Sequence, residues 1–107
     1  FLPEKLEVYG HTLVAPKQHY ADLYDIPEDI LCELIKVSKK ITIAYREKIN
    51  STGINLMHAS GVDGQQSVFH FHIHLLPRFK GDKLNTWPNL PKIKTDKDEL
   101  LQKLRLG

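Results

Sequence analysis

The chain has 107 residues, of which 41% are hydrophobic and 26% charged, a composition typical of a soluble globular domain. This length fits one domain and excludes two independent ones. The longest apolar runs fall far short of the ~20 residues that a membrane-spanning helix needs, so we expect no membrane partner. The single cysteine, Cys32, excludes an internal disulfide. Because the chain also shows no signal-peptide pattern, we expect a cytoplasmic protein.

The net charge is +2, and the excess of basic residues lies at the C-terminal end. Residues 78–107 hold eight Lys and Arg against four Asp and Glu, whereas residues 1–77 hold seven against nine. Since the basic residues of the tail alternate with acidic ones, the pattern is typical of a solvated surface. We therefore expect no nucleic-acid partner.

The first half of the chain predicts extended segments followed by one long helix. Two extended stretches cover residues 4–15, on either side of Gly10. A helix is expected from about Ile26 to Ile49, with Asp25 and Glu28 in the spacing of a capping box. Its apolar residues recur every three or four positions, which indicates one face packed on a sheet. They are Ile30, Leu34, Val37, Ile41, Ala44 and Tyr45.

The second half predicts two strands, a looser tail and a short helix. Residues 54–59 form the first strand and residues 67–76 the second, with a polar loop that contains glycine between them. Thr95 is expected to cap a final helix that runs through Leu106.

These elements predict a single α+β domain over residues 1–107, in which one long helix packs on a face of an antiparallel sheet. Residues 1–80 form the core of that domain, and residues 81–107 form a basic tail with a short C-terminal helix.

Histidine is over-represented in the chain, and three of the six histidines alternate in sequence, at His70, His72 and His74. Alternate residues of a strand point to one face and lie about 6.5 to 7 Å apart, so these three imidazoles should share the face opposite the helix. The residues between and beside them should form the apolar face. They are Phe69, Phe71, Ile73 and Leu75.

Three interpretations of this row remain open. The first is a set of surface histidines whose neighbours satisfy them. The second is a metal site in which His70 and His72 act with His11 or His74, although the outer pair of the row would lie about 13 Å apart. The third is attack of an imidazole on phosphorus, which needs an acceptor that fixes the tautomer and donors for the phosphoryl oxygens. The loop at residues 64–67 supplies donors of that kind.

Two segments resemble the histidine triad (HIT) family. Residues 70–76, His-Phe-His-Ile-His-Leu-Leu, are similar to the family signature His-x-His-x-His followed by two apolar residues. Residues 10–19, Gly-His-Thr-Leu-Val-Ala-Pro-Lys-Gln-His, resemble a second family segment, Gly-His-x-Leu-Val-x-Pro-Lys-x-His. The resemblance covers residues 1 to about 80. It implies an α+β fold with a five-stranded antiparallel sheet in a homodimer, and it places the family's first strands upstream of Phe1.

The resemblance also implies an activity: hydrolysis or transfer at the α-phosphorus of nucleoside phosphoramidates or dinucleoside polyphosphates, with no metal or other cofactor. His72 would be the nucleophile, and His74 would donate to the phosphoryl oxygens or the leaving group. His70 would orient His72 through its backbone carbonyl, and His11 would be a fourth, relaying histidine.

The phosphate-binding positions are only partly similar to the family pattern. Gln66 and Ser67 match positions that contact the phosphate or the leaving group, whereas Gln65 replaces a glycine that allows close backbone approach to phosphate. Two further positions lose polar groups that hold the nucleotide in the family: Ala59 and Pro3. Asn55 is a candidate to supply the missing amide. The alternative to an enzyme is therefore a nucleotide- or phosphate-binding protein without significant catalysis.

Overall fold

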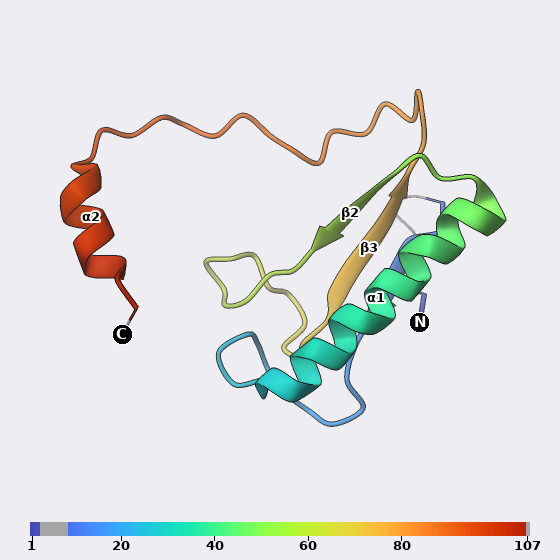
Figure 1. The fold of residues 1–107 in the computed structure, drawn as a ribbon, viewed down its shortest axis with the longest axis horizontal. Helices are drawn as coiled ribbons and strands as arrows, with labels where there is room; N and C mark the ends of the chain where they lie inside the picture. Colours follow the sequence, from blue (N-terminus) through green and yellow to red (C-terminus); the bar gives the residue numbers. More distant parts are fainter. Residues whose placement is uncertain (3–8, 107) are drawn as a thin grey trace.

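A computed structural model of the chain describes residues 1–2 and 9–106. Five elements follow in chain order: β1 (Thr12–Val14), α1 (Glu28–Ile49), β2 (Gly53–Met57), β3 (Ile73–Arg78) and α2 (Lys97–Leu104). The predicted α+β class is confirmed, with a small antiparallel sheet, one long helix packed on it and a short C-terminal helix (Figure 1). The first of the two expected extended stretches, before Gly10, lies almost wholly outside the described residues.

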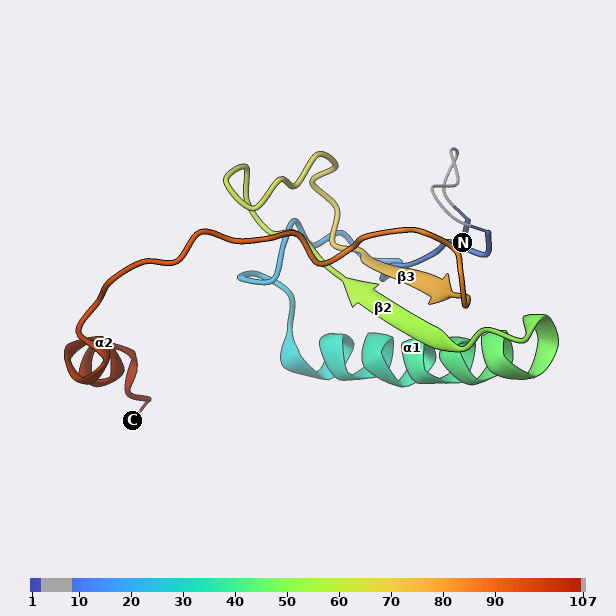
Figure 2. The same ribbon diagram turned by 90° about the horizontal axis from the view of Figure 1, so that it is seen from above.

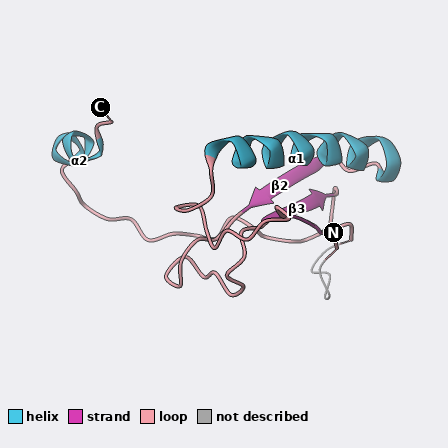
Figure 3. Cartoon of the chain, turned by 90° about the horizontal axis from the view of Figure 1, so that it is seen from below, coloured by secondary structure: helices cyan, strands magenta, loops and turns pink. Residues whose placement is uncertain are grey.

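β3 is the central strand of the sheet, with β1 and β2 antiparallel on its two sides. His74 is paired with Leu13 of β1 and with Met57 of β2. Because residues directly opposite each other share a face, these three side chains lie on one face of the sheet. Figures 2 and 3 show α1 on one side of the sheet and the loop that follows β2 on the opposite side. His74 lines a cavity together with residues of that loop.

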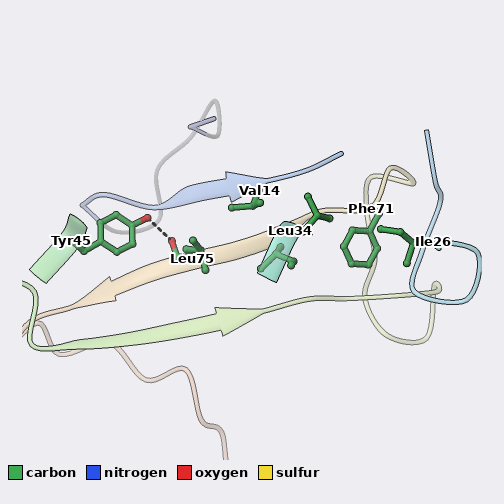
Figure 4. Close-up of a cluster of buried hydrophobic side chains, with 7 residues drawn as sticks. Val14, Ile26, Leu34, Tyr45, Phe71 and Leu75 are labelled. Carbon is green, nitrogen blue, oxygen red and sulfur yellow. Dashed lines mark hydrogen bonds between the residues drawn. The ribbon is translucent and has the colours of Figure 1, made fainter. Parts of the chain in front are cut away.

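The hydrophobic core lies between α1 and the sheet. Figure 4 shows Leu34 and Tyr45 of α1 in one buried cluster with Leu75 of β3, and Ile73 belongs to the same cluster. Ile30 and Ile41 pack partly against this cluster. The predicted apolar face of the helix is therefore largely confirmed. Val37 differs: its side chain is 42% exposed, because it borders a surface hollow beside residues 16–18.

The predicted capping box at the start of α1 is wrong. α1 begins at Glu28 after Pro27, and no side chain caps it. The carboxylate of Asp25 instead accepts hydrogen bonds from the backbone N–H groups of Asp22 and Ala21, which lowers its pKa below the usual value. Since these bonds turn the carboxylate back toward the preceding loop, the helix N-terminus is stabilised by the acidic side chains of its own first turn.

The predicted strand at residues 67–76 begins six residues later, at Ile73, and passes through Pro77 to Arg78. Before Ile73 the backbone bonds to other partners: the Phe71 N–H donates to the carbonyl of Tyr20. Phe69 is 48% exposed rather than part of the core face, because it precedes the strand. The alternation of apolar and polar residues thus extends further than the hydrogen-bonded ladder.

The tail leaves the sheet as an extended segment and ends in α2, which lies apart from the sheet (Figure 1). The predicted cap Thr95 is wrong by one position, since the carboxylate of Asp96 accepts the N–H groups of Asp98 and Glu99. α2 ends at Leu104 rather than Leu106, and none of its residues is buried. Within the described part of the chain, no helix is long and apolar enough to cross a membrane.

Candidate active site

His72 lies just before β3, and other histidines hold both its ring and its backbone. Its Nδ1 is 2.6 Å from the His70 carbonyl oxygen, so Nδ1 carries a proton and donates it. In the neutral ring this tautomer leaves the lone pair on Nε2, which is the atom an imidazole uses as a nucleophile. The carbonyl of His72 accepts in turn from His58, whose Nδ1 lies 2.9 Å away.

His74 connects this ring to the interior of the sheet. The rings of His72 and His74 meet edge to face, with centroids 4.9 Å apart. Nδ1 of His74 lies 2.9 Å from Nε2 of His11, which is almost fully buried. Since one of these two nitrogens donates and the other accepts, the pair can pass a proton between the two rings. The structure therefore brings together His11, His72 and His74.

The ring of His70 points elsewhere. Its Nε2 donates to the carbonyl of Pro16 over 3.0 Å, and its Nδ1 lies 3.1 Å from Nδ1 of His19. The predicted row of three rings on one strand face is thus corrected, because His70 and His72 precede the strand. The metal alternative requires three such side chains around one point, and the described residues contain no such group of His, Cys, Asp or Glu.

The loop after β2 is held together by the side chain of Gln66, which is 6% exposed. Its Oε1 accepts from the Gly61 N–H over 2.8 Å, and its Nε2 donates to the carbonyls of Ala21 and Val68 over 2.6 and 3.2 Å. All polar atoms of this amide therefore bond to backbone groups. In this structure the side chain holds the loop and is not directed at a ligand.

A cavity of about 400 Å³ opens beside His74, between β2, β3 and this loop. It has polar and apolar walls, formed by Met57, His58, Ala59, Gly64, Gln65, Ser67, His74 and Leu76. The structure thus places Gln65 and Ser67 with His74. Asn55 lies outside the cavity lining, since its Oδ1 accepts from Arg78 and Thr86 over 2.8 and 2.9 Å.

Arg78 lies on the same face of β3 as His74, but its guanidinium is fully engaged. Nε and Nη2 donate to the carboxylate of Asp82, each over 2.8 Å, and Nη2 also donates to the carbonyl of Leu84. Nη1 donates to Asn55 and Thr86. The bonds from Arg78 lower the pKa of Asp82 far below its usual value. This ion pair anchors the loop that follows β3 and leaves no excess positive charge at this end of the site.

Sequence reasoning missed His58. Its Nε2 bonds to the hydroxyl of Ser60 over 2.5 Å, its ring stacks on Phe71 with centroids 4.4 Å apart, and the Ser60 oxygen accepts the N–H of Leu23. The available signal was its position at the end of a predicted strand that pairs with the histidine-bearing strand. His58 therefore connects the backbone of His72 to two surface loops.

The family model described as "HIT domain" matches residues 1–81. An uncharacterized HIT-like protein of Methanocaldococcus jannaschii is 42% identical over 73 residues, which cover 68% of this chain and 56% of that protein. A protein of Candida albicans named adenosine 5′-monophosphoramidase is 35% identical over 95 residues, 85% of this chain and 62% of that protein. The chain thus spans little more than half the length of these curated relatives.

Solved structures show the same likeness. A histidine triad nucleotide-binding protein from Candida albicans superposes with a TM-score of 0.77 at 32% identity, over 96% of this chain and 74% of that one. A zinc-bound histidine triad family protein from Mycobacterium smegmatis superposes with a TM-score of 0.68 at 40% identity, over 75% of this chain and 58% of that one.

Proposed function

Because this chain belongs to the HIT family, we propose that it is a hydrolase that attacks the α-phosphorus of a nucleoside phosphoramidate or dinucleoside polyphosphate through a covalent histidine intermediate. The hydrogen bond from Nδ1 of His72 to the His70 carbonyl carries the proposal, because it fixes the tautomer that a nucleophile requires. The likeness to a protein named adenosine 5′-monophosphoramidase supports the substrate class.

In the first step, Nε2 of His72 forms a bond to the α-phosphorus while the bond from phosphorus to the leaving nitrogen or oxygen breaks. His74 gives the leaving group its proton. In the second step, water attacks phosphorus and the bond between phosphorus and Nε2 of His72 breaks. His74 takes up the proton that water loses. His11 shares that proton through its bond to His74, and the Ser67 hydroxyl and neighbouring backbone N–H groups bind the phosphoryl oxygens.

We further propose a cytoplasmic homodimer. β2 is an edge of the described sheet, and its apolar side chains are open to solvent: Ile54 is 36% exposed, Leu56 49% and Met57 41%. An exposed apolar edge strand favours pairing with another chain. A second copy that covers β2 would bury these side chains, and a chain with Cys32 as its one cysteine suits a reducing compartment.

Turnover of adenosine 5′-phosphoramidate by the wild type and by His72→Asn tests the proposal. The wild type should release adenosine monophosphate in the presence of a chelator, and intact-mass spectrometry of the quenched reaction should show a nucleotidyl adduct. His72→Asn should lose both while keeping the wild-type melting temperature. His19→Asn is the matched control and should retain turnover, because the His19 ring contacts the ring of His70, whose orienting group is its backbone carbonyl. Equal turnover by the wild type and His72→Asn would refute the mechanism.

The second candidate is a nucleotide- or phosphate-binding protein without significant catalysis. The cavity wall favours it at Ala59, where a methyl group stands in place of the polar side chain that holds the nucleotide in the family. This alternative predicts a folded wild type that binds the nucleotide without turning it over, and binding that survives His72→Asn in calorimetry.

A further inference from the structure

Gln65 has an unusual backbone conformation beside the candidate active site. Its φ is +69°, in the left-handed region that glycine adopts freely and longer side chains rarely do. Two turn bonds hold it there, from the Gln65 N–H to the Val62 carbonyl and from the Gln66 N–H to the Gly61 carbonyl. Residues kept in such conformations concentrate at functional sites, so Gln65 is a candidate for a functional role.

Gln65 is an exposed residue of the cavity wall. The side chain lines the cavity together with Ser67 and His74, and it makes no hydrogen bond to any residue that the structure describes. The loop beneath it is fixed by the three bonds of the Gln66 amide. The backbone that carries this amide is therefore fixed before a ligand arrives, and the exposed side chain keeps both a donor and an acceptor for that ligand.

The cavity carries no permanent charge to receive an anion. Its polar groups are one amide, one hydroxyl and two imidazoles, and no Lys or Arg is among the described residues that line it. Arg78, on the same face, is neutralised by Asp82. A departing polyphosphate brings several negative charges, which proteins normally receive with cationic groups. A neutral amine needs only hydrogen-bonding partners, and those are present.

We propose that Gln65 is a specificity-determining residue that binds the leaving group, and that it selects phosphoramidates of hydrogen-bonding amines over dinucleoside polyphosphates. This inference rests on the proposed function. The phosphorus–nitrogen bond breaks as Nε2 of His72 bonds to phosphorus, the amine takes a proton from His74, and it leaves as a neutral molecule. The Gln65 amide bonds to a polar group of that amine and not to the reacting atoms.

Three adenylyl substrates test the inference: the glycinamide phosphoramidate, the unsubstituted phosphoramidate and diadenosine tetraphosphate. The wild type should prefer them in that order by kcat/KM. Gln65→Ala should lower the ratio of kcat/KM between the first two substrates about 3- to 10-fold, the effect of one neutral hydrogen bond. Gln102→Ala, which removes an exposed glutamine of α2, is the matched control and should keep the wild-type ratio.

The variant Gln65→Gly distinguishes the effect of the side chain on substrate preference from its effect on stability. Glycine relieves the strain at φ +69°, so the melting temperature should rise while the substrate ratio falls as in Gln65→Ala. An equal change of kcat/KM with both phosphoramidates, or a wild type that prefers the tetraphosphate, would overturn the inference and leave the proposed function in place. A folded wild type without turnover of any of the three substrates would overturn both.

Discussion

Replacement of Gln66 tests whether its amide serves the loop or a ligand. Gln66→Ala removes three hydrogen bonds from a side chain that is 6% exposed and leaves the Gly61 N–H and the Ala21 carbonyl without their partner. At about 0.5 to 1.5 kcal/mol for each bond, we expect the free energy of unfolding to fall by about 2 to 4 kcal/mol. This loss is smaller than the roughly 5 to 15 kcal/mol by which a typical domain is stable, so the variant should still fold at 25 °C.

The isosteric change Gln66→Glu adds a pH dependence to the same test. The introduced carboxylate still accepts from Gly61 but faces the carbonyl oxygens of Ala21 and Val68, to which only a protonated carboxyl can donate. Its pKa in the folded state should therefore lie above the usual value of about 4.3. Because the folded state then binds the proton more tightly, the variant should be more stable relative to the wild type at pH 5 than at pH 7.5.

Urea unfolding of the wild type, Gln66→Ala and Gln66→Glu at these two pH values measures both effects. The reasoning would be refuted by an alanine variant within about 0.5 kcal/mol of the wild type, the range of ordinary surface substitutions. A glutamate variant whose stability difference from the wild type does not change with pH would also contradict it. Either result would remove the structural role of the Gln66 amide and leave it available for the phosphate contact that the family resemblance implies.

Three further outcomes are expected. The bonds from Arg78 lower the pKa of Asp82. In urea titrations the stability difference between the wild type and Asp82→Asn should therefore stay constant from pH 8 to pH 5 and shrink only below about pH 3.9. A decline above pH 5 would contradict the pairing. Tyr45→Phe should cost only about 1 kcal/mol in thermal unfolding, because the Gly10 carbonyl keeps a second donor. Leu56→Lys on β2 should convert the proposed homodimer to a monomer in light scattering, and an unchanged mass would exclude this edge as the interface.

Local periodicity was sufficient to predict the main elements. The apolar spacing from Ile30 to Tyr45 predicts α1 and its inward face, since a helix repeats every 3.6 residues whatever it packs against. The alternation around Ile73 and Leu75 likewise predicts the core face of β3. The spacing of the three histidines, with the segment that contains His11, was enough to indicate the family.

Tertiary hydrogen bonds account for what the sequence could not predict. Asp25 has the spacing of a helix cap, yet the N–H groups of the preceding turn compete for its carboxylate. The role of His58 depends on the His72 carbonyl, which lies 14 residues further along the chain. The interior role of the Gln66 amide depends on the Ala21 carbonyl, which is 45 residues distant. Such contacts exist only once the chain has folded.

The position of His70 and His72 ahead of β3 limits how this site can be transplanted into a designed protein. In a regular strand the backbone carbonyls of both residues would bond to neighbouring strands. Here they are free to accept from the His72 ring and from His58. A designer who copied the alternating histidines onto a continuous strand would keep the three imidazoles. The design would lose the hydrogen bond from the His72 ring to the His70 carbonyl, which fixes the tautomer of His72. The transferable unit is the strand together with the irregular six residues that precede it.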